Sequence, residues 1–94
     1  MRIRWLDDAV DDLVEISDYI ANDNPNAARN VAQRIKNSVN SLKEHQGIGR
    51  LGRVEGTREL GVSGLPYIIP YRVKNNVIEI LHVLHGARTW PEKL

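Results

Sequence analysis

The sequence predicts a small α+β domain in which a two-helix antiparallel hairpin packs on a mostly antiparallel four-stranded sheet. In the first half of the chain, apolar residues recur at steps of three and four, as in amphipathic helices. In the second half, short runs rich in Val, Ile, Leu and Tyr are typical of strands. Asn75-Asn76 separates two of these runs, and asparagine tolerates the positive φ angles of a two-residue hairpin turn. The predicted order is strand, helix, helix and three strands, followed by a short C-terminal turn.

The length and composition predict one domain, covering 1–94. With 41% hydrophobic and 27% charged residues, the chain resembles ordinary globular proteins. Its apolar runs are much shorter than the ~20 residues that span a membrane, and its start lacks the pattern of a signal peptide. The absence of cysteine removes disulfides, thiolate nucleophiles and Cys-based zinc sites. We therefore expect a cytoplasmic protein with no membrane association, stabilised by packing alone.

The first two elements are predicted from local pattern. Arg2–Trp5 alternates polar and apolar residues, as a half-buried strand does, and it would suit the edge of the sheet. Apolar residues at helical spacing then indicate an amphipathic helix over roughly 8–21. Asp7 or Asp8 can accept hydrogen bonds from the free amides at its start, so we expect one of them to cap it.

The second helix is predicted to follow almost at once. Asn24 is a good capping residue, and Pro25 suits the first helical position because the amide it lacks has no partner there. The apolar stripe of this helix consists of Ala28, Val31, Ile35, Val39 and Leu42. Two helices joined by so short a link form an antiparallel pair, and their narrow stripes require the sheet as a cover.

Between the helices and the sheet, the segment Gly47–Arg53 contains three glycines and two arginines. The order of residues in a phosphate-binding loop is missing, and no helix follows. We interpret the segment as a flexible connector whose Arg50 and Arg53 are available to a nucleic acid or a protein partner.

Three strands are predicted after this connector, at about 57–62, 67–74 and 77–84, and the last two pair as a hairpin. Pro70 interrupts the second of them. Because proline donates no ladder hydrogen bond, we expect a bulge or a sheet edge at that point.

Charge is distributed unevenly. Residues 1–28 carry two basic and seven acidic side chains, a net charge of −5, and subtraction from the totals of 13 and 12 leaves +6 for 29–94. Acids in the first turn of a helix favour its dipole, and solvated faces are charged anyway. The basic part is the better candidate for contact with a partner.

No metal or cofactor site is predicted. His82 and His85 are three residues apart, so in a strand they point to opposite faces, which is poor geometry for shared metal binding. We expect His82 to be buried, with its ring nitrogens hydrogen-bonded in the interior of the protein. The serines lack a nucleophile motif, and the spacing of Glu59 and Glu79 gives no reason to place them in one cleft.

One set of polar residues remains as a candidate functional site. It consists of Arg58, Arg72, His85 and Arg88, with Tyr67 and Tyr71 nearby. Arginine offers a planar fork to phosphate, and histidine transfers protons near neutral pH. Such a set would suffice for metal-free cleavage of RNA through its 2′-hydroxyl. The alternative is that the arginines are solvated sheet residues and the tyrosines belong to the core.

Motifs along nearly the whole chain also resemble those of a known family. They are Trp5, Asp12-Leu13, Asn24-Pro25 with Ala27-Ala28, Gly49-Arg50 with Gly52-Arg53-Val54, Gly56-Thr57-Arg58-Glu59-Leu60, Pro66-Tyr67, and Leu84-His85-Gly86-Ala87-Arg88 with Trp90-Pro91. In this order they resemble the RelE/ParE superfamily of toxins. The resemblance implies the toxin half of a type II toxin–antitoxin pair, a bacterial cytoplasmic protein that forms a hetero-oligomer with a small antitoxin.

The superfamily contains two activities, and the resemblance is nearer to ParE than to RelE. RelE-like members are ribosome-dependent mRNA endonucleases, whereas ParE-like members inhibit DNA gyrase. The RelE pattern has an arginine just after the tyrosine matched here by Tyr67, and a tyrosine in the tail. Ile68 and Leu94 stand at those positions, although Arg88 matches a second RelE arginine. A net charge of only +1 is also a poor match for a site among ribosomal phosphates.

We therefore expect growth inhibition by binding to gyrase. The residues expected to contact the target are Arg58, Tyr67, Arg72, His85, Arg88 and Trp90. If the chain is instead a nuclease acting on mRNA at the ribosome, the catalytic set would be Arg58, Arg72, His85 and Arg88. A third possibility is an inactive family member that serves as a protein-binding module.

Overall fold

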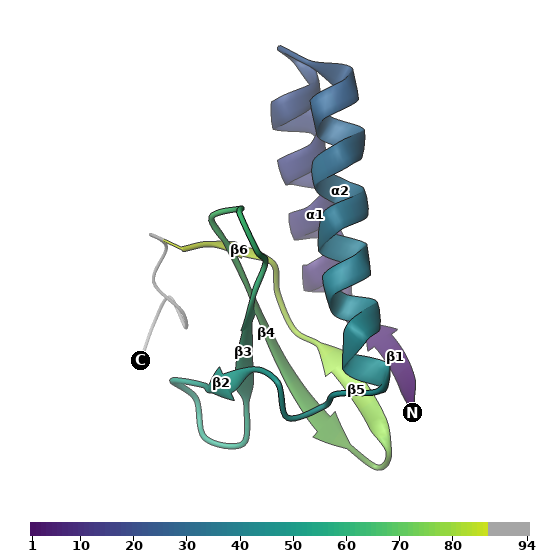
Figure 1. Cartoon of the computed structure of the whole chain (residues 1–94), viewed down its shortest axis with the longest axis vertical. Coiled ribbons are helices and arrows are strands. Elements are labelled where there is room, and N and C mark those ends of the chain that lie inside the picture. The colour runs from purple at the N-terminus through teal and green to yellow at the C-terminus, as the bar shows by residue number, and fades with distance from the viewer. Residues whose placement is uncertain (87–94) are drawn as a thin grey trace.

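The computed structural model describes residues 1–86, and residues 87–94 lie outside this description. Two long helices stand side by side, and a twisted sheet packs against them (Figure 1). In chain order the elements are β1 (Arg2–Trp5), α1 (Asp7–Ala21), α2 (Pro25–Asn40), the 3-10 helix η1 (Ser41–Lys43), β2 (Arg50–Leu51), β3 (Arg58–Gly61), β4 (Tyr67–Lys74), β5 (Val77–Ile80) and β6 (Leu84–His85). The predicted α+β class and the helical hairpin are thus confirmed. Among residues 1–86, neither helix is long and apolar enough to cross a membrane.

The sheet has more strands than predicted. Its order is β1-β5-β4-β3-β2, and β6 also pairs with β4. All pairs are antiparallel except β1 with β5, where Arg2 lies opposite Val77 in parallel register. The two additional strands are short. β2 lies in the segment predicted as a flexible connector. The predicted strand 77–84 is interrupted at 81–83, and β6 begins at its last residue, Leu84.

The hairpin predicted at Asn75-Asn76 is confirmed. Both asparagines have positive φ, 53° and 61°, as the turn requires. They bring Tyr71–Lys74 into antiparallel register with Val77–Ile80. The hairpin is thus fixed by local sequence, and the remaining strands add to it.

The predicted irregularity at Pro70 is also present. Residues 71–74 pair with β5, and residues 67–68 pair with β6, so two residues of β4 lie opposite three residues, 81–83. The carbonyl of Pro70 accepts a hydrogen bond from the amide of Leu81 at 2.9 Å. The extra residue displaces the chain between β5 and β6, as a bulge does, and this displacement positions His82 and Val83.

The two helix starts differ. The side chain of Asn24 accepts a hydrogen bond from the Ala27 amide at 3.0 Å, and Pro25 occupies the first turn, as predicted. The predicted cap of α1 is wrong, because Leu6 precedes the helix and no side chain caps it. Asp7 and Asp8 lie inside the first turn, where they favour the helix dipole.

The core lies between the helical pair and one face of the sheet. Its fully buried side chains include Ile35, Val39, Leu42, Ile69, Tyr71, Ile78 and Ile80. The hydroxyl of Tyr71 donates to the carbonyl of Gln46 and accepts from the amide of Gly49. A Cβ at Gly49 would lie 2.7 Å from this ring, so glycine is required there. The segment between η1 and β2 is therefore fastened to the core.

Candidate functional site

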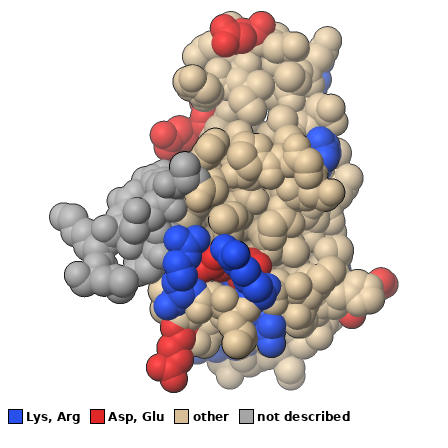
Figure 2. Space-filling view, turned by 60° about the vertical axis from the view of Figure 1, so that its left-hand side comes forward, with Lys and Arg blue, Asp and Glu red and all other residues tan. Residues whose placement is uncertain are grey.

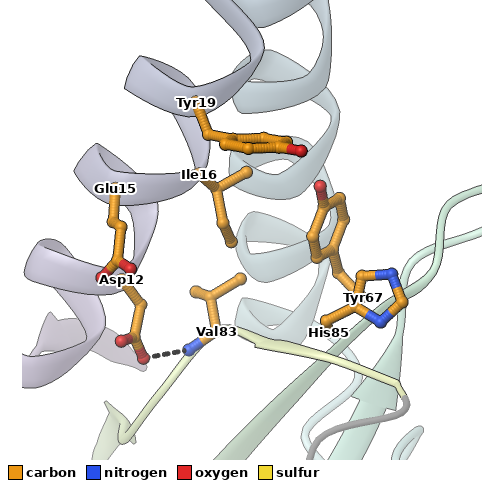
Figure 3. Close-up of a pocket in the computed structure, with 7 residues that line it drawn as sticks. All are labelled: Asp12, Glu15, Ile16, Tyr19, Tyr67, Val83 and His85. Carbon is orange, nitrogen blue, oxygen red and sulfur yellow. Dashed lines mark hydrogen bonds between the residues drawn. The ribbon is translucent and has the colours of Figure 1, made fainter.

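Two of the predicted site residues meet where β4 pairs with β6. Tyr67 lies opposite His85 in this antiparallel pair. Their ring centroids are 6.0 Å apart and the planes are 85° apart, which is an edge-to-face contact. Both side chains point to the side of the sheet on which α1 lies (Figure 3).

A hollow of about 260 Å³ lies between this pair and α1, and we name it the tyrosine groove. It is lined by Asp12, Glu15, Ile16, Tyr19, Tyr67, Val83 and His85 (Figure 3). Glu15, Ile16 and Tyr19 lie three, four and seven residues after Asp12, so the four α1 residues share one face of the helix. Tyr19 stands at the rim with 78% of its surface exposed.

Asp12 fastens this wall of the groove to the sheet. Its Oδ2 accepts a hydrogen bond from the Val83 amide at 2.9 Å and lies 2.9 Å from Nδ1 of His82. Nε2 of His82 is 3.8 Å from a carboxylate oxygen of Asp8. His82 is thus satisfied by carboxylates, but its side chain is 27% exposed and lies at the margin of α1, not in the interior as predicted.

Two carboxylates and no arginine or lysine line the groove among residues 1–86. Glu15 is exposed and forms no ion pair with any residue in 1–86. The last turn of α1 carries no basic residue that would offset the negative end of the helix dipole. A positively charged group entering the groove would therefore be favoured, and an anion would be repelled.

The opposite face of the sheet has a different arrangement of charges. Glu79 lies between Arg4 and Arg72 in the register of three adjacent strands. Its carboxylate is 2.6 Å from Nε of Arg72 and 3.8 Å from Nη1 of Arg4. The hydrogen bond from Arg72 lowers the pKa of Glu79, although partial burial raises it.

Glu59 on β3 forms a second cluster of this kind. Its side chain is 1% exposed, and it accepts hydrogen bonds from Arg50 at 3.2 Å and from the Arg53 guanidinium and amide at 3.2 and 3.0 Å. Burial raises the pKa of Glu59, but the hydrogen bonds from Arg53 and Arg50 outweigh it and lower the pKa. Figure 2 shows basic side chains gathered on both sides of an acidic one.

The other predicted site residues lie apart from Tyr67 and His85. Nη1 of Arg58 donates to the carbonyl of Gly49 at 2.8 Å and so holds the segment before β2. Arg72 is five residues from Tyr67 along β4, a distance of ~17 Å, and points to the opposite face. Arg88, Trp90 and Leu94 lie outside the described residues.

Five residues of the groove were not predicted as site residues: the apolar Ile16 and Val83, and the polar Asp12, Glu15 and Tyr19. For the polar three, the only signal in the sequence was their spacing of three, four and seven residues, which places two acids and a tyrosine on one face of α1. Within residues 1–86 there is no group of three or more His, Cys, Asp or Glu residues that could hold a metal ion. The chemistry offered by the described part of the groove is recognition by aromatic rings and carboxylates.

Comparison with known proteins agrees with the fold. Residues 3–90 match the family described as ParE toxin of type II toxin–antitoxin system, parDE. The protein Y4kP of Sinorhizobium fredii is 47% identical over 93 residues, covering 99% of this chain and 96% of the relative. Toxin RelE2 of Caulobacter vibrioides is 38% identical over 87 residues, covering 93% and 97%.

A solved structure is also similar, with a TM-score of 0.84 and 34% sequence identity. It is described as the chromosomal ParDE TA system from P. aeruginosa, and the match covers 90% of this chain and 95% of that one. The family match extends over nearly the whole chain, and both relatives match at almost full length. This chain therefore belongs to the ParE toxin family of type II toxin–antitoxin systems.

Proposed function

We propose that this toxin acts in the cytoplasm by binding DNA gyrase and inhibiting it. Membership of the family implies an antitoxin partner, which neutralises the toxin. The observation that carries the gyrase proposal is the separation of the arginines from the histidine. His85 contacts Tyr67, whereas Arg58 and Arg72 are engaged with a carbonyl and a carboxylate elsewhere.

This separation favours binding over metal-free RNA cleavage. Cleavage through the 2′-hydroxyl requires proton-transfer groups and cationic side chains around one phosphate, each within hydrogen-bond distance. In residues 1–86, no arginine lines the tyrosine groove. The carboxylates of Asp12 and Glu15 would repel a phosphate there.

The proposed contact surface for gyrase combines Tyr67 and His85 with residues predicted from the sequence. Arg88 and Trp90 follow His85 within five residues of the sequence, and both lie outside the described residues. Arg72 lies on the opposite face of the sheet beside Glu79, with 42% of its side chain exposed, so it would contact the target separately from Tyr67 and His85. Arg58 would contribute indirectly by holding the segment before β2.

A supercoiling assay tests this proposal directly. Purified toxin is added to gyrase, ATP and relaxed plasmid, with the toxin–antitoxin complex as a negative control. We expect loss of supercoiling with free toxin and little loss with the complex. His85→Ala should reduce inhibition, whereas His45→Ala, which removes an exposed histidine outside the groove, should not. Unchanged supercoiling at large molar excess of wild-type toxin would refute gyrase as the target.

A second function, cleavage of mRNA on the ribosome, is favoured by one observation. The relative of 38% identity is named Toxin RelE2. In this case His85 would move protons and Arg88 would neutralise the scissile phosphate, with Arg58 or Arg72 assisting. Primer extension on translating ribosomes distinguishes the two functions: discrete cuts that disappear in His85→Ala and Arg88→Ala would support the nuclease. An intact transcript in growth-arrested cells would exclude it.

A further inference from the structure

We propose that the tyrosine groove binds an arginine or lysine side chain of the antitoxin. The proposal rests on the antitoxin partner that the family implies, and it is independent of whether the target is gyrase or the ribosome. It adds to the proposed function a specific place on the toxin, the α1 side of the groove, at which the antitoxin would be recognised.

The shape of the groove suits one long amphipathic side chain. Its volume of about 260 Å³ is below the roughly 300–1,000 Å³ typical of pockets for drug-sized ligands. Ile16, Val83 and the ring of Tyr67 form apolar walls, against which the methylene stem of lysine or arginine can pack. The rings of Tyr19 and Tyr67 lie on two sides of the hollow (Figure 3), an arrangement that attracts a cation through the π-systems.

The carboxylates of the groove favour a side chain that ends in a positive charge. One oxygen of Asp12 is already used by Val83 and His82, so Glu15 is the carboxylate available to an incoming group. The buried sheet glutamates Glu59 and Glu79 lie beside arginines, whereas Glu15, an exposed residue of α1, lines the groove and has no basic neighbour within ion-pair distance in residues 1–86. A partner cation would supply the missing charge, and a nucleic acid would be repelled.

The exposed ring of Tyr19 points to a protein as the source of this cation. An aromatic side chain that is 78% exposed beside a hollow with apolar walls is typical of an anchor position in a protein interface. Because Tyr67 and His85 line the same groove, an antitoxin bound there would cover part of the proposed target surface. Neutralisation by occlusion would follow from this placement.

The experiment uses the toxin together with the antitoxin encoded beside it, and it measures their affinity and the rescue of growth. Glu15→Lys is compared with Asp11→Lys, which makes the same type of charge reversal one turn earlier on α1, outside the groove. We expect Glu15→Lys to weaken the complex by about a hundredfold and Tyr19→Ala by about tenfold. Asp11→Lys should change the affinity less than about threefold.

Two further measurements separate recognition from folding and from target binding. Glu15→Lys should retain the wild-type unfolding midpoint and remain toxic without antitoxin, yet escape neutralisation. Each Lys and Arg of the antitoxin is then changed in turn to Glu, and one of these variants should restore binding to Glu15→Lys. Equal affinities for wild type, Glu15→Lys and Tyr19→Ala would overturn the proposal, as would a scan in which no antitoxin variant restores binding.

A direct titration provides an outcome that does not depend on the antitoxin. N-acetyl-arginine amide should shift the NMR signals of Tyr19 and Tyr67 in the millimolar range, and N-acetyl-leucine amide should not. Equal shifts with both compounds would show that the groove recognises apolar surface alone. If supercoiling were unaffected while Glu15→Lys escaped the antitoxin, the gyrase proposal would fail and this one would stand.

Discussion

The carboxylates on the two sides of this small sheet are in opposite situations. On the face away from the helices, Glu59 and Glu79 each lie between two arginines. In the tyrosine groove, Asp12 and Glu15 face a hollow that no described arginine or lysine lines. The comparison shows that the number of charges on a face does not identify a binding site. An unpaired carboxylate that also lines a hollow with apolar walls, as Glu15 does, is the better indicator.

The sheet-face carboxylates are largely committed to the fold. The carboxylate of Glu59 is almost fully buried, yet its pKa is lowered, because its hydrogen bonds from Arg53 and Arg50 outweigh the cost of burial. Those arginines therefore have less capacity for an outside anion than their exposure suggests. The basic excess of residues 29–94 is thus partly structural.

The largest expected effect comes from breaking the Glu59 cluster. Glu59→Ala removes the acceptor of three donor groups in the segment containing Arg50 and Arg53. We expect a loss of ~1–3 kcal/mol in the free energy of unfolding, moderated because both arginines are partly solvated. Urea denaturation measures this loss. Glu55→Ala, an exposed glutamate in the adjoining loop, serves as the control and should change stability by less than ~0.5 kcal/mol.

The two groove carboxylates should also differ from each other. Asp12→Ala removes the acceptor of the Val83 amide and the contact with His82, so we expect a loss of ~1–2 kcal/mol in unfolding free energy. Glu15→Gln should leave stability within ~0.5 kcal/mol of wild type. Equal destabilisation by the two substitutions would show that Glu15 is a structural group and would remove the contrast between the two sides of the sheet.

The comparison also predicts a dependence of stability on pH. Glu59 and Glu79 have pKa values below the ordinary glutamate value of 4.5 in the folded protein. The unfolded chain therefore binds more protons below that value, so stability is complete above about pH 4.5 and falls as pH decreases through the folded pKa values. Urea midpoints between pH 3 and 7 should show this decline. Glu59→Gln should make it shallower, and an identical slope in that variant would contradict the assignment.

The smallest effect is expected at the rim of the Glu79 cluster. Nη1 of Arg4 is 3.8 Å from Glu79 and the side chain is 69% exposed, whereas Nε of Arg72 is 2.6 Å away. Exposed pairs contribute little because water screens them. Arg4→Gln should therefore shift the thermal midpoint less than Arg72→Gln does. The reverse order would mean that the longer contact is the stronger one in solution.

Local signals were sufficient for much of the fold. The asparagine turn, the Asn24 cap with Pro25 and the interruption at Pro70 were predicted because each depends on a few adjacent residues. The cap of α1 was predicted wrongly, since the helix begins directly after Leu6 and Asp7 lies inside its first turn.

Features that depend on distant residues were beyond the sequence. The strand at Arg50–Leu51 exists because β3 pairs with it, not because of its own propensity. Tyr67 and His85 were predicted as site residues one by one, but their place in a groove depends on the contact of Asp12 with Val83, 71 residues away. Because this contact joins residues distant in the sequence, the acids of α1 were interpreted as a solvated helix face.

The parallel pairing of β1 with β5 has a consequence for the synthesis of the toxin. Arg2 pairs with Val77, so the first strand has no partner until more than four fifths of the chain has been synthesised. The contact between Asp12 and Val83 comes later still. Such distant pairings form slowly, and a nascent chain lacking its last strands cannot close the groove. The antitoxin would then recognise the finished toxin and not its translation intermediates.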